Sequence, residues 1–237
     1  MNFPGVEEIH RRHTDILERV ARAADRTGRD PRSVALLAVT KTHPPELVRL
    51  AALAGLTRFG ENRVVEGISK IEALRGDFPA LVWALIGPLQ SNKARAALQW
   101  FSMVETLDRE RLATRLEGLL PPGAPPYPVL LEINIASEAS KSGASPGEAE
   151  ALVAGVLQRG RLQLRGLMAV PPFDADPQAA RPHFRRLREL RDRLANRFGQ
   201  SFPELSMGMS HDFEVAIEEG STEIRLGTAL FGDRSAT

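Results

Sequence analysis

The sequence predicts an α/β protein, a single (β/α)8 TIM barrel with an extra N-terminal helix. Three observations lead to this fold class: eight short apolar runs alternate with helical patterns, the runs lack polar alternation, and no linker divides the chain. Strands covered on both faces lose polar alternation, and strand–helix alternation indicates a parallel sheet. Eight such units in 237 residues favour a closed barrel. We therefore expect residues 1–237 to form one domain.

The predicted strands are rich in Val, Ile, Leu and Phe, as buried parallel strands are. They are Val34–Val39, Thr57–Gly60, Leu81–Ile86, Phe101–Glu105, Val129–Asn134, Gln163–Val170, Glu204–Met207 and Glu223–Gly227. The one Pro/Gly-rich stretch, Pro121–Pro128, is short and lies between a helix and a strand. It is interpreted as a loop at the N-terminal end of the barrel.

Helix signals fill the gaps between these strands. Apolar residues recur every three or four positions, and Pro or a capping box marks several starts. The first two expected helices run from Pro45 to just before Gly55 and from Val64 to Leu74, and a short third helix follows Asn92. The remaining expected helices are Asp108–Leu119, Ala149–Gln158, Phe184–Phe198 and Asp212–Glu219. The capping box Ser145–Glu148 precedes Ala149–Gln158. Val6, Ile9, Ile16 and Val20 form the apolar stripe of the additional N-terminal helix.

Charge and composition exclude several classes of protein. The 31 basic and 30 acidic residues nearly cancel, which argues against a nucleic-acid binder, and Glu189 and Asp192 interrupt the arginine-rich stretch Arg181–Arg197. The absence of Cys excludes disulfides and thiolate metal sites. No long apolar run and no signal-peptide pattern occur, so we expect a cytoplasmic protein with no membrane contact. No distinctive apolar helix face is evident, so we expect a monomer.

Lysine is rare in this chain, and its positions are informative. Only Lys41, Lys70, Lys93 and Lys141 occur among the 31 basic residues. A lysine can lose its proton and attack a carbonyl, whereas arginine stays protonated. Active sites of such barrels lie where the strands end. Three of the four lysines fall on that face, and Lys41 directly follows the first strand, while Lys70 is expected within a helix.

The loops after the seventh and eighth strands predict a phosphate site. Ser210 follows one strand, and Gly227 and Thr228 end the other. These loops frequently bind phosphate in this fold, through hydroxyls and backbone N–H groups. The simpler alternative to a phosphate site is that Gly208 and Gly227 only permit tight turns. An imine-forming lysine beside a phosphate site indicates a phosphorylated aldehyde, either pyridoxal 5′-phosphate (PLP) or the substrate of a sugar-phosphate aldolase.

Seven sequence blocks resemble one known family. They are Leu37-Ala-Val-Thr-Lys41-Thr, Phe59-Gly-Glu-Asn-Arg63, Ile86-Gly-Pro-Leu-Gln-Ser-Asn-Lys93, Lys141-Ser-Gly143, Gly166-Leu-Met-Ala-Val-Pro-Pro172, Leu205-Ser-Met-Gly-Met-Ser210 and Arg225-Leu-Gly-Thr-Ala-Leu-Phe-Gly232. In this order they resemble the YggS/PROSC family of pyridoxal phosphate homeostasis proteins, which is similar in fold to the N-terminal barrel of alanine racemase. The resemblance covers residues 34–232 and favours PLP over the aldolase substrate.

The resemblance implies a role for each candidate residue. Lys41 would form the Schiff base with PLP. Ser210, Gly227 and Thr228 would bind its phosphate, together with main-chain groups of Met209. The remaining two are Arg225, which would face the pyridine nitrogen, and Asn62, which would line the pocket near the ring.

One position departs from the family pattern. Ala84 stands where the family usually has a histidine, so any role of that imidazole is in doubt here. His211, next to Ser210, is a conceivable replacement, but a surface histidine at a helix start is the preferred interpretation. The roles of Lys93 and Lys141 stay open between a second cofactor contact and a release route.

The same residues favour a carrier over an enzyme. An arginine at the pyridine nitrogen donates a hydrogen bond without protonating the ring, which weakens the electron sink. Racemisation also needs a second proton donor on the opposite face of the substrate carbon. The single tyrosine, Tyr127, precedes the fifth strand and should lie at the closed end. We therefore expect a PLP carrier that supplies apo PLP-dependent enzymes, with no catalytic residues; the alternative is a weak amino-acid racemase using Lys41 with water or His211.

Overall fold

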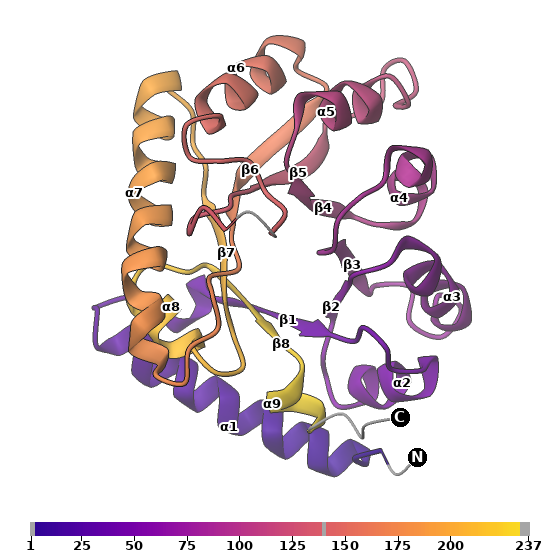
Figure 1. Cartoon of the computed structure of the whole chain (residues 1–237). Helices are drawn as coiled ribbons and strands as arrows, with labels where there is room; N and C mark the ends of the chain where they lie inside the picture. The colour runs from indigo at the N-terminus through magenta and orange to yellow at the C-terminus, as the bar shows by residue number, and fades with distance from the viewer. Residues whose placement is uncertain (1–2, 139–140, 233–237) are drawn as a thin grey trace.

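The computed structural model describes residues 3–138 and 141–232 and shows a closed barrel of eight parallel strands in chain order (Figure 1). The predicted fold class is confirmed. The strands are β1 Ala35–Val39, β2 Arg58–Glu61, β3 Val82–Leu85, β4 Met103–Leu107, β5 Tyr127–Glu132, β6 Leu162–Met168, β7 Glu204–Met209 and β8 Glu223–Leu226. Parts of the expected domain and of the loop after β5, residues 1–2, 139–140 and 233–237, lie outside the described residues.

Most strand starts agree with the expectation to within one residue, and two differ by two residues. β4 begins at Met103 because the N–H of Phe101 still bonds to Ala97 O and ends the preceding helix. β5 begins at Tyr127, two residues earlier than expected, because Tyr127 and Pro128 already pair with Leu162 and Gln163 of β6. Tyr127 is thus the first residue of the strand and does not precede it. Its position at the N-terminal end of the barrel agrees with the prediction.

Helices cover the outside of the barrel (Figure 1). They are α1 Val6–Asp25, α2 Pro45–Leu53, α3 Val64–Leu74, α4 Ala94–Trp100, α5 Glu110–Glu117, α6 Ala149–Arg159, α7 Arg181–Phe198, α8 Phe213–Glu218 and α9 Thr228–Phe231, with short 3-10 turns η1 Pro31–Ser33, η2 Ser91–Lys93 and η3 Pro177–Ala180. α5 is shorter than the predicted Asp108–Leu119. α9 was not predicted, because a single turn has no periodicity to detect.

The predicted capping box at the start of α6 is present. The N–H of Ser145 donates to the Glu148 carboxylate at 2.9 Å, and the N–H of Glu148 donates back to Ser145 Oγ at 3.3 Å. These bonds satisfy two N–H groups that would otherwise have no partner at a helix start.

The extra helix α1 lies across the outside of the barrel, against α2, α8 and α9 (Figure 1). Ile9, Ile16 and Val20 of its apolar stripe are buried, as predicted. Arg19 adds an ion pair with Glu214 of α8 at 2.8 Å. α1 therefore joins the first and last units of the barrel. Across the described chain, no helix has the length and apolar character that crossing a membrane requires.

Gly208 in β7 shows why a glycine is needed beside the predicted phosphate loop. Its φ is +97°, and a Cβ there would lie 2.6 Å from Ala216 Cβ and 3.0 Å from Phe213 Cα of α8. The glycine lets α8 pack directly on the strand that leads to Ser210.

We predict that Gly208→Ala destabilises the protein by about 2–4 kcal/mol, because a positive-φ penalty adds to overpacking against α8. Gly123→Ala is the matched control: Gly123 also has positive φ, +75°, but an added Cβ meets no atom within 4 Å. It should cost only about 1 kcal/mol. Urea unfolding of both variants provides the measurement, and equal losses would contradict the packing argument.

Candidate functional site

The predicted cofactor residues come together at the C-terminal ends of four neighbouring strands, β7, β8, β1 and β2. β8 pairs with β1 through Leu226 and Ala38, and β1 pairs with β2 through Val39 and Gly60. Lys41, Asn62 and Thr228 each follow the end of one of these strands, and Ser210 follows β7. Residues from both ends of the chain thus meet at one rim of the barrel.

The loops after β7 and β8 contact each other directly. The N–H of Ala229 donates to Ser210 Oγ at 3.1 Å. Gly227 lies so close to β1 that a Cβ there would be 3.3 Å from Val39 O. Thr228 is exposed at the start of α9, which follows the C-terminal end of β8. The N–H of Met209 is already used, because it donates to Asp212 Oδ1 at 2.6 Å.

Arg225 is held rigidly inside the barrel mouth. The residue is 5% exposed, and its Nη1 and Nη2 donate to Ser206 Oγ at 2.6 Å and to Ala169 O at 2.9 Å. A guanidinium has five N–H donors, so these two bonds fix its plane and leave donors for another acceptor.

A network of buried carboxyl groups lies around Ser206. Its Oγ is 2.7 Å from Glu105 Oε2 and 3.1 Å from Glu223 Oε1, and Glu223 also accepts from Arg58 at 2.8 Å. Burial, reinforced by the Glu223 carboxylate, raises the pKa of Glu105 well above its ordinary value. Glu105 thus shares Ser206 with a second buried carboxyl group in the barrel interior, and the proximity of the two favours the neutral form of Glu105.

Glu132 at the end of β5 is a second perturbed acid. Burial, together with the nearby Asp108 carboxylate, raises the pKa of Glu132 to about 7. Its Oε2 is buried and has no hydrogen-bond partner among the described residues. This group changes its charge near neutral pH at the rim of the barrel.

A buried ion cluster supports the loop that carries Lys41. Lys70 of α3 is 2% exposed, and its Nζ lies 2.7 Å from Thr40 O, from Glu61 Oε1 and from Glu66 Oε1. Thr40 Oγ1 donates to Glu61, and the N–H of Thr42 donates to Glu66. The backbone on both sides of Lys41 is thus anchored.

This cluster explains the local conformation. Thr42 adopts φ +67°, a left-handed backbone that β-branched residues rarely take, and the bond to Glu66 stabilises it. Burial raises the pKa of Glu61, and the Lys70 ammonium opposes that rise. Lys70 lies in a helix as predicted, but its amine reaches the base of the Lys41 loop, a role that its sequence position did not suggest.

Asn62 carries an unused acceptor at the same rim. Its Oδ1 is buried and finds no hydrogen-bond partner within the described residues. Gly87 packs against the backbone of Asn62, with its would-be Cβ 2.7 Å from Asn62 Cα. Asn62 also lines a pocket of about 480 Å³ together with Gln90 and Lys93.

The other residues considered from the sequence have surroundings of several kinds. Lys93 is exposed in η2, and Lys141 forms an ion pair with Glu138 at 2.5 Å. His211 is exposed, as expected, and contacts Ala175 O at 3.1 Å. Ala84 is buried in β3. Tyr127 donates to Phe101 O at 2.8 Å at the far end of the barrel, where burial raises its pKa.

The sequence interpretation missed the buried acids Glu61 and Glu105 and the buried lysine Lys70. Glu61 and Glu105 stand within largely buried strands, and a charge in such a strand is a signal of a buried polar network. Lys70 had no comparable signal, because a lysine in an amphipathic helix usually faces solvent. Among the residues described, no group of three or more His, Cys, Asp or Glu side chains could bind a metal ion.

A comparison with known protein families gives the general class of this protein. The sequence matches the family described as "Alanine racemase, N-terminal domain" over residues 14–235. Together with the closed barrel, this match makes the chain a barrel protein of the alanine racemase N-terminal type.

More similar relatives then give the particular family. A protein named "Pyridoxal phosphate homeostasis protein" from Pseudomonas aeruginosa is 47% identical over 219 residues, which cover 92% of this chain and 93% of the relative. A protein of the same name from Aquifex aeolicus is 42% identical over 219 residues, which cover 92% of this chain and 95% of the relative. The chain belongs to the pyridoxal phosphate homeostasis protein family. The structure of PipY from Synechococcus elongatus, described with PLP bound, is 37% identical with a TM-score of 0.79, covering 92% of this chain and 100% of PipY.

We predict that Lys70→Met destabilises the protein by about 3–5 kcal/mol, because it leaves the fully buried Glu61 without its counter-charge. The double variant Lys70→Met/Glu61→Gln should recover much of this loss, and Lys93→Met, on an exposed turn, should stay within about 0.5 kcal/mol of the parent. Urea unfolding measures all three. If the double variant is no more stable than Lys70→Met, the ion pair is not the cause.

We predict that Glu132→Gln reduces the loss of stability on raising the pH. The wild-type carboxyl has a folded-state pKa of about 7 against an ordinary value of 4.5, so its favourable contribution is complete below about 4.5 and is lost as pH rises through about 7. The difference in unfolding free energy between acidic and alkaline pH should shrink by on the order of 1–2 kcal/mol, allowing for partial exposure. Unfolding curves across this pH range, with the exposed Glu189→Gln as control, test it; identical pH profiles for Glu132→Gln and wild type would refute the assignment.

Proposed function

We propose that this chain binds PLP at the open end of the barrel, holds it as a Schiff base on Lys41, and serves intracellular PLP homeostasis without robust turnover. The observation that carries the proposal is the meeting of Lys41, Ser210, Gly227 and Arg225 at the adjacent ends of β1, β7 and β8. The PLP-bound PipY structure, at 37% identity, supports PLP as the ligand.

The residues present fit the chemical groups of PLP. Ser210 and Thr228 offer hydroxyls, and the side-chain-free Gly227 leaves backbone open to a phosphate. The unused donors of Arg225 suit a ring nitrogen, and the buried Asn62 Oδ1 suits a donor on the ring. Met209 remains in the proposed set, but its N–H would have to exchange the Asp212 carboxylate for a phosphate oxygen.

The chain's own residues would hold the cofactor with little movement. PLP supplies an aldehyde that accepts an amine and a ring that can withdraw electrons. The anchored neighbours Thr40 and Thr42 present the Lys41 amine, and the bonds from Ser206 and Ala169 fix the Arg225 plane. Arg225 would donate a hydrogen bond to the ring nitrogen, and a guanidinium donor in that place would leave the nitrogen neutral.

Two further observations support storage over turnover. Racemisation requires a second acid–base group across the substrate carbon from the lysine. Tyr127 lies at the opposite end of the barrel. His211 is exposed and held against Phe173, with ring centroids 5.4 Å apart. We therefore propose a carrier, monomeric and cytoplasmic, whose recipients are apo PLP-dependent enzymes.

We predict that protein loaded with PLP shows the visible absorption of a Schiff base and that Lys41→Ala abolishes it, because Lys41 supplies the amine. Borohydride reduction and peptide mapping should label Lys41, while Lys93→Ala and Lys141→Ala should retain the band. A wild type that stays colourless after incubation with PLP would overturn the proposal.

A racemisation assay tests the proposed absence of turnover. Loaded protein incubated with L-alanine should yield no D-alanine above a no-protein control. Sustained production of D-alanine that Lys41→Ala abolishes would establish the racemase alternative instead. Borohydride trapping that required an added sugar phosphate would favour an aldolase.

A further inference from the structure

Most arginines on the side of the barrel formed by α1, α7 and α8 are neutralised. Arg181, Arg185 and Arg188 of α7 all pair with Glu219, at 3.0 to 3.2 Å. Arg26 at the end of α1 likewise pairs with Glu218 at 2.6 Å. An arginine-rich chain with balanced charge thus keeps its guanidinium groups compensated on this side.

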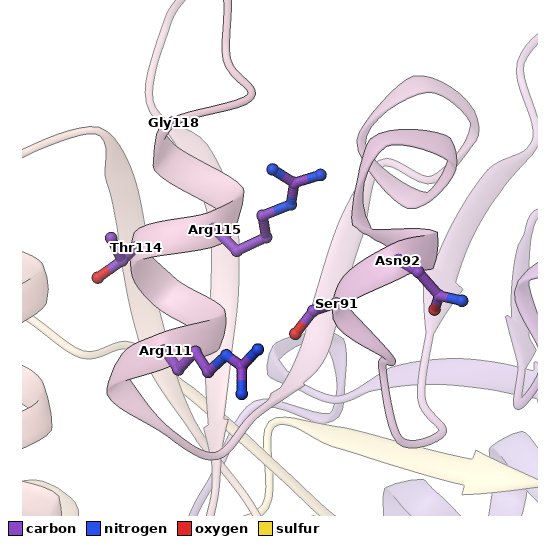
Figure 2. A pocket seen from close by; sticks show the side chains of 6 residues that line it. All are labelled: Ser91, Asn92, Arg111, Thr114, Arg115 and Gly118. Atoms are coloured by element: carbon purple, nitrogen blue, oxygen red, sulfur yellow. The ribbon is translucent and has the colours of Figure 1, made fainter.

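The opposite side contains a pocket where this compensation is missing. Between η2–α4 and α5 lies an open pocket of about 650 Å³, and the side chains of Arg111, Arg115 and Ser91 point into it (Figure 2). Within the described part of the chain, neither arginine has a hydrogen-bond or ion-pair partner. Gly118, directly after the last residue of α5, also lines the pocket.

The two arginines are arranged unfavourably for stability. They stand at i and i+4 of one helix, where like charges destabilise by about 0.2–0.5 kcal/mol. Acids are present on the same helix, but Glu110 and Glu117 both pair with Arg159 of α6. α5 therefore directs its negative charges to α6 and its positive charges to the pocket.

This arrangement suits an anion with several oxygens. A guanidinium presents a rigid fork of N–H donors that matches phosphoryl oxygens in pairs, and two forks on one helix face can contact a single compact polyanion. Ser91 adds a hydroxyl donor from the facing turn. Lys93 and Arg95, exposed beside Ser91 and without ion pairs among the described residues, increase the local positive potential.

We propose that the pocket between η2–α4 and α5 is a second binding site, specific for the phosphoryl groups of a small ligand. α4 and α5 lie away from α9 (Figure 1), and none of the residues that line this pocket belongs to the proposed cofactor site. The ligand class is a compact phosphate ester or diphosphate, held by Arg111, Arg115 and Ser91.

Calorimetric titration of the whole protein with inorganic pyrophosphate tests the site. Arg111→Gln/Arg115→Gln should weaken binding at least tenfold, because two charge-assisted contacts are lost. Arg186→Gln/Arg193→Gln is the matched control: both arginines are exposed on α7 without ion pairs in the described structure, and the change in net charge is the same. This control should bind within about twofold of wild type.

Each of the following results of the titration would overturn the proposed site or its ligand class. Equal weakening in both double variants would show a general charge effect and overturn the site. Unchanged binding in Arg111→Gln/Arg115→Gln would place pyrophosphate elsewhere, such as the Ser210–Thr228 loops, and would also overturn it. Succinate is the probe for ligand class: binding as tight as that of pyrophosphate would refute specificity for phosphoryl groups. Wild-type-like unfolding curves confirm that each variant is folded.

Discussion

The hydrogen bonds between β8 and β1 close the barrel, and the candidate site depends on that closure. Without it, Lys41 and Thr228 would stand at opposite ends of an open sheet, each beside an unpaired strand edge. With it, the register Ala38 to Leu226 sets Gly227 against Val39 and brings the two loops together. The site is therefore a property of the closed ring, and no single unit contains it.

The buried parts of the protein hold more charge than stability requires. Burying ion pairs such as Lys70–Glu61 rarely improves on well-packed apolar residues. Here the buried groups hold other residues in defined positions: Lys70 holds the loop that carries Lys41, and Ser206 holds the guanidinium of Arg225. Burial and the neighbouring Glu223 carboxylate raise the pKa of Glu105 within this interior. We infer that the polar interior is retained because it orients the groups at the rim.

Sequence patterns predicted the fold and placed the candidate site residues on one face for identifiable physical reasons. Apolar runs alternating with helices specify a parallel barrel, and the rule that function lies at strand ends placed Lys41, Ser210 and Thr228 on one face. The register that joins them across β8 and β1 is a long-range fact that no local pattern contains. Lys70 faces inward from a helix, and the Met209 N–H is used by Asp212. Both depend on side-chain directions that residue type alone does not determine.

The position of α1 has a consequence for how the chain folds. Its apolar stripe is covered by α8 and α9 as well as α2, so α1 is fully buried only after helices much later in the chain have formed. Contacts of such long sequence separation slow folding, and until they form, the stripe and the edges of an unclosed sheet stay exposed. The nascent chain therefore passes through an aggregation-prone stage that ends only when the final βα unit docks. Contact with other copies of the same partly folded chain would favour aggregation most strongly at that stage.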